Sequence, residues 1–206
     1  MTNHKGKFIV FEGPDGGGHS TQADLLKENL VSRGYDVLLT VEPTRTDSPE
    51  ASAVSLMIRQ VLQKQEILDP AELQVLFTED RREHLETVIE PALRAGKVVI
   101  SDRYFFSTFA YGSLDADLEW LIELNREFRT PDKAFALLVR PEVYLERIAR
   151  RGTGSELFET LRNFRRLNEA YRGLAQRFPA LEILDGERPI PEIHADVLAK
   201  MKSVLK

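Results

Sequence analysis

A glycine-rich segment near the start of the chain has the residue types and spacing that bind phosphate. Residues 13–20 match the pattern G-x-x-x-x-G-K-[ST] at every fixed position except the lysine, which here is His19. Glycines allow successive backbone N–H groups to turn towards phosphate oxygens at the positive end of a following helix. The phosphate site that this pattern predicts consists of Gly13, Gly16, Gly17, Gly18, His19, Ser20 and Thr21. In this pattern the Ser20 hydroxyl is a ligand of Mg²⁺.

Two other interpretations of the glycines are weaker. An ordinary strand-to-helix turn would not require a hydroxyl residue in register, and Ser20 is in register here. A dinucleotide-binding loop of the form G-x-G-x-x-G fails at one or more glycines wherever its first glycine is placed. A nucleotide phosphate site is therefore the preferred interpretation.

His19 is the departure that matters for chemistry. A lysine supplies a permanent charge on a long stem, whereas histidine is shorter and has an ordinary pKa of about 6.5. One hypothesis is that bound polyphosphate favours the imidazolium, so that activity survives but is weaker or more dependent on low pH. The other is a chain that binds nucleotide without useful turnover. Turnover of the natural chain and of His19→Lys, compared across pH, separates the two.

Two further segments carry paired arginines. Residues 76–81 read Leu-Phe-Thr-Glu-Asp-Arg, and residues 101–104 read Ser-Asp-Arg-Tyr after an apolar run. Arg81 and Arg103 offer planar, permanently charged groups that can bind a phosphate through two hydrogen bonds and stabilise charge as it moves. The alternatives are that Phe77 is a core residue and that Arg81 pairs with a neighbouring carboxylate, Glu79 or Asp80, on a solvated helix face.

These segments, together with residues 8–22, resemble those of thymidylate kinases, which transfer a phosphoryl group from ATP to dTMP. The resemblance continues through Ala110-Tyr111-Gly112 to residues 141–147 and covers most of the chain. It implies that Phe77 stacks on thymine, that Arg81 contacts base and phosphate, and that Arg103 holds the dTMP phosphate. It also implies that Asp102 organises Mg²⁺, and that Asp15 lies at the sugar 3′-hydroxyl. Thr108 and Tyr111 fall where relatives read the base and exclude a ribose 2′-hydroxyl.

The resemblance also implies a lid and shows departures from the family pattern. A lid at about residues 148–158 would bring Arg150 and Arg151 to the phosphates as catalytic residues, although basic residues in a last helical turn are also common for dipole reasons. Val41 stands where relatives often have arginine, and Arg45 is a candidate substitute in the dTMP site. Relatives commonly read Ala-Tyr-Gln-Gly where this chain has a glycine directly after Tyr111.

Alternating strands and helices must position these groups. Short apolar runs predict strands at 8–11, 37–41, 98–100, 134–139 and 181–184. Helical spacing predicts helices from Ser20 to about Gly34 and over 52–63, 70–95, 117–128, 141–151, 157–178 and 191–205. Right-handed crossovers then give an α/β three-layer sandwich with a five-stranded parallel sheet flanked by helices. The resemblance implies that this sandwich is a P-loop kinase fold with a lid segment.

Composition limits the remaining possibilities. The 206 residues fit one domain, 1–206, and the net charge of −5 disfavours a nucleic acid polymer as partner. No apolar run is long enough to span a membrane and no secretory signal pattern is present, so we expect a cytoplasmic protein. Because there is no cysteine, disulfides, a thiolate zinc site and a cysteine nucleophile are excluded. The resemblance implies a homodimer whose substrates are ATP and dTMP. The expected reaction is ATP- and Mg²⁺-dependent conversion of dTMP to dTDP, the alternatives being another deoxynucleoside monophosphate kinase or a nucleotide-binding regulator.

Overall fold

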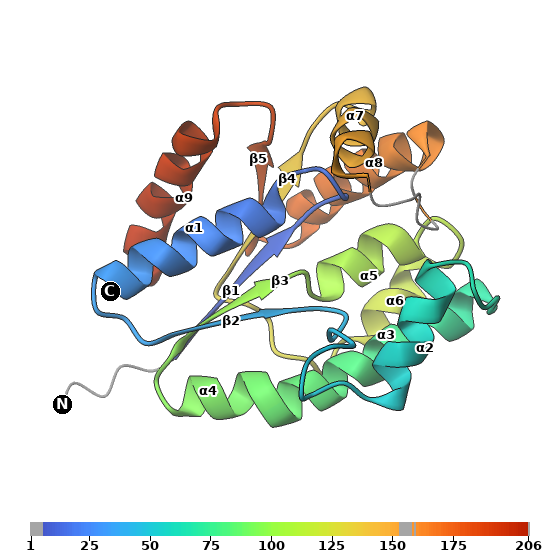
Figure 1. Ribbon diagram of the computed structural model, residues 1–206, viewed down its shortest axis with the longest axis horizontal. Coiled ribbons are helices and arrows are strands. Elements are labelled where there is room, and N and C mark those ends of the chain that lie inside the picture. Colours follow the sequence, from blue (N-terminus) through green and yellow to red (C-terminus); the bar gives the residue numbers. More distant parts are fainter. Residues whose placement is uncertain (1–5, 153–157, 159, 206) are drawn as a thin grey trace.

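A parallel sheet with helices on both faces forms the body of the molecule. The computed structural model describes residues 6–152, 158 and 160–205. Its five strands are all parallel, in the order β2-β3-β1-β4-β5, and Figure 1 shows the helices on the two sides. The strands are β1 (Lys7–Glu12), β2 (Val37–Val41), β3 (Val98–Asp102), β4 (Lys133–Leu138) and β5 (Leu181–Asp185). The predicted three-layer α/β fold is confirmed.

The helices follow most of the predicted segments. They are α1 (His19–Ser32), α2 (Ala53–Leu62), α3 (Pro70–His84), α4 (Glu90–Arg94), α5 (Phe105–Gly112), α6 (Leu118–Leu124), α7 (Pro141–Arg151), α8 (Leu161–Arg177) and α9 (Ile190–Val204). A π-helical segment, η1 (Leu85–Ile89), joins α3 to α4. Among the described residues, no helix has the length and apolar character needed to cross a membrane.

The central strand β1 divides its side chains between two cores. Because successive strand residues point to opposite faces, Phe8 and Val10 enter one layer and Ile9 and Phe11 the other. Helices α1 and α9 cover the second layer, and α4, α5 and α8 contribute to the first (Figure 1). Because helices cover both faces of the sheet, its carboxyl-terminal edge is left for polar side chains. This edge is where ligands bind in open α/β sheets.

The structure differs from the helices predicted from the sequence at three places. The helix expected over 70–95 contains a π-helical segment that ends two residues before Pro91, which cannot donate to the carbonyl four residues earlier. Helix α5 was not predicted, because its aromatic residues resemble a strand by composition. Helix α6 covers only part of the range 117–128, from the residue after its N-cap Asp117.

The predicted lid can be followed only in part. Helix α7 ends at Arg151, and Gly152 follows in the left-handed conformation with a φ of 68°. Residues 153–157 of the predicted lid lie outside the described residues.

Candidate functional site

The glycine segment forms a tight turn between β1 and α1. Gly13, Gly16 and Gly18 have positive φ values of 135°, 88° and 101°, which side chains disfavour. A Cβ on Gly17 would come within 2.7 Å of the Leu137 carbonyl oxygen. Gly18 is the N-cap of α1 and offers no side-chain cap, so the first N–H groups of the helix are available to an anion. Local geometry therefore agrees with the predicted phosphate loop.

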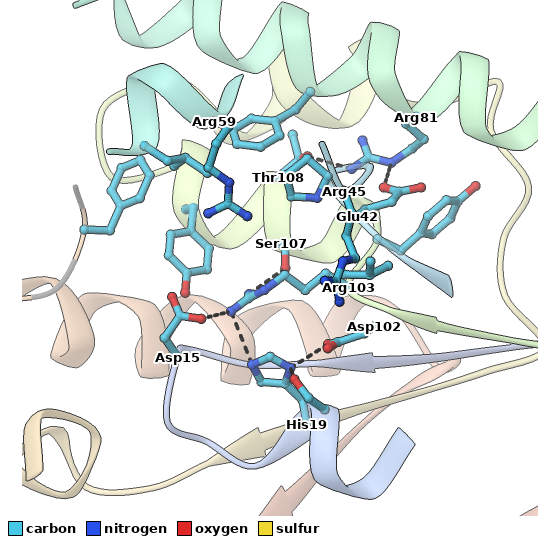
Figure 2. A pocket seen from close by; sticks show the side chains of 18 of the residues that line it. Asp15, His19, Glu42, Arg45, Arg59, Arg81, Asp102, Arg103, Ser107 and Thr108 are labelled. Atoms are coloured by element: carbon cyan, nitrogen blue, oxygen red, sulfur yellow. Dashed lines mark hydrogen bonds and ion pairs between the residues drawn. The ribbon is translucent and has the colours of Figure 1, made fainter. Parts of the chain in front are cut away.

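The side chain of His19 bonds to two charged groups at the end of β3. Its Nδ1 lies 2.6 Å from Oδ1 of Asp102, and its Nε2 lies 3.2 Å from Nη2 of Arg103 (Figure 2). Because a guanidinium only donates, Nε2 must accept from Arg103, and Nδ1 then donates to Asp102. His19 is buried, whereas the neighbouring Ser20 is exposed. The ring that replaces the lysine is therefore fixed by the protein's own charges.

Asp102 is strongly ionised. Burial raises the pKa of its carboxyl, but His19 and Arg103 outweigh burial and lower the pKa to about 2. The Ser20 hydroxyl also bonds to this carboxylate and lies 3.3 Å from the imidazole Nδ1. Two oxygen groups of the type that Mg²⁺ prefers therefore meet beside the loop.

The backbone of Arg103 is held in an unusual conformation. Its φ of 72° lies in the left-handed region, which residues with side chains rarely adopt. The Arg103 N–H donates to the Phe11 carbonyl at 2.7 Å, and the Ser101 hydroxyl donates to the Arg103 carbonyl at 2.7 Å. These bonds to β1 and β3 fix the point from which the side chain leaves the sheet.

The Arg103 guanidinium then turns back towards the glycine loop. Its Nη2 donates to Oδ1 of Asp15 at 2.8 Å, and its Nη1 donates to Oγ of Ser107 at 3.2 Å (Figure 2). The ring centre of Tyr111 lies 5.4 Å from the guanidinium carbon, within cation–π range. Burial raises the pKa of Asp15, but Arg103, His19 and Arg151 together lower it below its ordinary value, so the carboxyl beside Arg103 is charged.

A buried carboxyl, Glu12, supports the start of α5. Its Oε1 accepts from the Tyr104 backbone N–H at 2.9 Å, and its Oε2 accepts from the hydroxyls of Ser107 and Tyr171 at 2.6 and 3.1 Å. Burial raises the pKa of Glu12 to about 7, although these hydroxyls and Arg103 oppose the increase. Glu12 therefore links the end of β1 to the helix that carries Ser107 and Thr108.

Arg81 lies at the centre of a buried polar cluster. Its Nε donates to Oε2 of Glu42 at 2.8 Å, its Nη1 to Oδ1 of Asn125 at 2.6 Å, and its Nη2 to Oγ1 of Thr108 at 3.1 Å. His84 lies 3.3 Å from the other oxygen of Glu42. We name these five residues the Arg81 cluster. Side chains of Arg81 and Glu42 are only 2% and 4% exposed.

This arrangement excludes one alternative for Arg81. The interpretation that Arg81 pairs with Glu79 or Asp80 on a solvated helix face is wrong, because Arg81 points inwards and bonds to Glu42. Asp80 instead accepts from the Thr44 backbone N–H at 2.8 Å. Burial raises the pKa of Asp80 above its ordinary value. A carboxylate from the end of β2, distant in sequence, therefore holds the arginine.

One pocket of about 280 Å³ brings most of the predicted side chains together. The predicted residues that line it are Asp15, His19, Ser20, Arg45, Phe77, Arg81, Asp102, Arg103, Thr108 and Tyr111. Figure 2 shows the charged groups converging from the loop, β3 and α3. Phe77 lines this pocket half-buried, so the interpretation that it is only a core residue is wrong. Val41 is also at the wall, and Arg45 pairs there with Asp47 at 2.8 Å.

The predicted lid arginines belong to the last turn of α7, where Arg151 is close enough to Asp15 to lower the pKa of that carboxyl. Arg150 pairs with Glu146 at 2.6 Å on the exposed side of α7, and neither Arg150 nor Arg151 lines the pocket. Arg147 is closer to the glycine loop, since it donates to the carbonyl oxygens of Gly16 and Gly186 at 3.0 Å each. The catalytic role expected of Arg150 and Arg151 stays a prediction.

Sequence reasoning missed several residues of the site, four of which carry polar groups that the geometry brings out. Glu12 ends β1 and belongs to no motif, and Glu42 lies in the Thr40–Pro43 segment, where the comparison with the family pattern concerns only Val41, so their buried contacts reveal both. Arg59 of α2 lines the pocket, and its spacing from the other site residues gave no signal. Gln74 could have been found, because it lies one helical turn before Phe77 on the same face of α3.

Comparisons with known proteins agree with this geometry. The family model described as "Thymidylate kinase" matches residues 11–197. The chain belongs to the thymidylate kinase family. It is 42% identical over 206 residues to "Probable thymidylate kinase" of Thermococcus kodakarensis, covering 96% of this chain and 98% of the relative. It is 35% identical over 208 residues to "Thymidylate kinase" of Desulfotalea psychrophila, covering 100% of this chain and 99% of the relative.

A third relative, "Probable thymidylate kinase" of Pyrococcus horikoshii, is 39% identical over 207 residues, with 98% of each chain covered. The predicted family membership is confirmed. The glycine loop of this chain has histidine at the position where the general phosphate-binding pattern has lysine.

Proposed function

We propose that this thymidylate kinase family member transfers a phosphoryl group from ATP to dTMP, forming dTDP. The observation that carries the proposal is a single pocket joining the glycine loop, Arg103 and the Phe77–Arg81 face of α3. The loop suits the polyphosphate of the donor, and Arg103 suits the phosphate of the acceptor. Phe77 offers an aromatic surface for the base.

Catalysis by these residues would consist mainly of positioning and charge stabilisation. Phosphoryl transfer leaves little covalent chemistry to the protein, because charge spreads over oxygens that fixed donors can stabilise. Arg103 already points at the loop, and its partner Asp15 is held 2.8 Å away. An acceptor phosphate would replace Asp15 as a partner of Arg103, which frees the Asp15 carboxylate to accept from the sugar 3′-hydroxyl.

The residues beside the loop also fit Mg²⁺. Ser20 and Asp102 supply oxygen donors, the latter ionised at neutral pH. No group of three or more acidic, histidine or cysteine side chains forms a metal site in the described part of the chain. An ion held by Ser20 and Asp102 would therefore take its other ligands from phosphate and water. When bound, the ion would neutralise charge on the phosphates.

A coupled assay with ATP and Mg²⁺ tests the proposal. With dTMP, dUMP, dCMP and dGMP as acceptors, we expect the largest kcat/KM for dTMP, and we expect turnover to stop with EDTA and return with excess Mg²⁺. Titrations with ATP and dTMP accompany the assay. Tight binding of both without dTDP, or a larger kcat/KM for another acceptor, would contradict the proposal. The homodimer and the cytoplasmic location remain predictions.

A further inference from the structure

The guanidinium of Arg103 has two kinds of partner, which differ in whether an arriving phosphate can replace them. Its Nη2 bonds to Asp15 and His19, which both belong to the glycine segment 13–20. The Asp15 side chain is 36% exposed, so an anion can reach this side of the guanidinium. Its Nη1 instead donates to Oγ of Ser107 in the first turn of α5 (Figure 2). The bond to Ser107 is therefore the one that can hold the guanidinium in place while phosphates bind.

Ser107 can accept from Arg103 because its own proton is used elsewhere. The Ser107 hydroxyl donates to Oε2 of Glu12 at 2.6 Å. A hydroxyl has one proton and an ionised carboxylate only accepts, so this bond fixes the direction in which the hydroxyl points. The lone pairs of Oγ are then left for the guanidinium, which only donates. Glu12 thus determines that Ser107 presents an acceptor to Arg103.

Glu12 also fixes the backbone that follows Arg103. Its Oε1 accepts from the backbone N–H of Tyr104, the N-cap of α5, whose own side chain makes no capping bond. The carboxylate therefore takes the place of a capping side chain at the positive end of the helix. Because the Arg103 N–H bonds to Phe11, contacts on both sides of Arg103 hold its positive φ.

A carboxyl that only caps α5 is the alternative. Glu12 is fully buried, and burying an ionised carboxyl is costly unless other groups compensate its charge. A neutral acceptor would cap the helix at less cost. Burial raises the pKa of Glu12, and the Ser107 hydroxyl and the Arg103 charge are the two largest influences that oppose this increase. The charge of Glu12 is therefore coupled to the two groups that lie between it and the glycine loop.

We propose that Glu12 is a positioning residue for phosphoryl transfer, which acts through the Ser107 hydroxyl and keeps the Arg103 guanidinium aimed at the glycine loop. The role of Glu12 rests on the proposed function, because Arg103 is the group proposed to hold the acceptor phosphate. Glu12 itself touches no substrate. Its contribution is to keep one prong of the guanidinium bonded to the protein while the other exchanges Asp15 for phosphate.

A double-mutant cycle tests the route through Ser107. Glu12→Gln keeps an acceptor for Tyr104 but presents amide N–H groups to Ser107, and Ser107→Ala removes the acceptor of Arg103. At pH 8, above the pKa of about 7 for Glu12, we expect each variant to lower kcat with dTMP about tenfold. The double variant should also lose about tenfold, whereas independent roles would multiply to about a hundredfold. The KM for ATP should stay unchanged, because the glycine loop keeps its contacts.

Tyr171→Phe is the matched control. The Tyr171 hydroxyl donates to the same Oε2 of Glu12 at 3.1 Å, but it comes from α8 and its removal leaves the bonds from Glu12 to Ser107 and from Ser107 to Arg103 in place. We expect kcat to change less than twofold. The melting temperature should fall, because a buried hydrogen bond is lost.

Four results would overturn the inference. They are full kcat in either single variant, a hundredfold loss in the double variant, a parallel rise in the KM for ATP, and a loss in Tyr171→Phe equal to that in Glu12→Gln. In each case the natural chain still converts dTMP to dTDP, so the proposed function stands. A natural chain that does not phosphorylate dTMP overturns the proposed function as well.

Discussion

The two halves of the pocket compensate their charges differently. Around the glycine loop, Asp15, His19 and Asp102 converge on Arg103, and the side chains of Asp15, Asp102 and Arg103 are 36%, 16% and 14% exposed. In the Arg81 cluster, Arg81 and Glu42 are nearly inaccessible and bond to side chains from α5 and the end of α6. Charges on the loop side can exchange partners when an anion arrives. Charges in the cluster cannot, because separation would leave a buried ion unpaired.

This difference assigns phosphate binding to the loop side of the pocket and preorganisation of the pocket wall to the Arg81 cluster. The loop side is arranged to receive phosphates, whose negative charge would replace contacts now made by Asp15. The cluster is complete before any substrate binds, so it holds the α3 face rigid against α5. Changes in the cluster should therefore act mainly on stability, and changes on the loop side mainly on activity.

Arg81→Met should give the largest change in stability. Removing one partner of a buried ion pair typically costs about 3–5 kcal/mol of unfolding free energy, because Glu42 loses its main compensation. Urea unfolding followed by circular dichroism measures this difference. Arg82→Met, next in sequence but half-exposed and paired with Glu127, is the matched control and should change little. If the two substitutions lowered the free energy of unfolding by similar amounts, the buried Arg81 cluster would not contribute more to stability than an exposed ion pair.

Arg103→Ala should give the largest change in activity. Loss of a donor aimed at transition-state charge typically costs about 100- to 1000-fold in kcat. Steady-state kinetics with dTMP measure the loss, and the melting temperature is recorded in parallel. Arg103→Lys should recover only part of the rate, because an ammonium lacks the two-pronged geometry. Full activity of Arg103→Ala would place the acceptor phosphate elsewhere.

Glu12→Gln should alter how stability depends on pH. The pKa of Glu12 is raised from 4.5 to about 7 in the folded state, so below pH 7 the folded chain keeps a proton that the unfolded chain releases above about 4.5. The free energy of unfolding therefore falls as pH rises through this window, by about 3 kcal/mol in total. Glutamine does not titrate. The free energy of unfolding of the variant, relative to that of the natural chain, should therefore increase with rising pH.

Unfolding of both proteins in urea at mildly acidic and mildly alkaline pH measures this gain. Glu119→Gln, at an exposed residue paired with Arg177, is the control and should give the same difference at both pH values. A difference between Glu12→Gln and the natural chain that does not change with pH would mean that Glu12 is ionised throughout.

His19→Lys should give the smallest of these effects. A lysine can reach bound phosphates with a permanent charge, so we expect kcat/KM for dTMP to rise about tenfold and to depend less on pH. Part of the gain should be lost because Asp102 and Arg103 lose the ring that joins them. Kinetics across pH measure the change. No gain and no change in pH dependence would show that the loop needs no cation at position 19.

Motifs predicted those parts of the site that depend on local spacing. The glycine loop needs its residues in one continuous turn, so its sequence is enough to recognise it. Phe77 and Arg81 share a face because they are four residues apart on a helix. Helix α5 escaped prediction because its aromatic residues carry no helical signal, and packing in the apolar layer decides its conformation.

The sequence by itself determined the parallel α/β fold, the phosphate loop and the residue types that face it, because each depends on short-range periodicity or motif spacing. Only the tertiary structure decided the partners: His19 with Asp102, Arg81 with Glu42, and Glu12 with Ser107. These contacts join segments from different strands and helices. Their geometry follows from sheet order and helix packing, which no local pattern encodes.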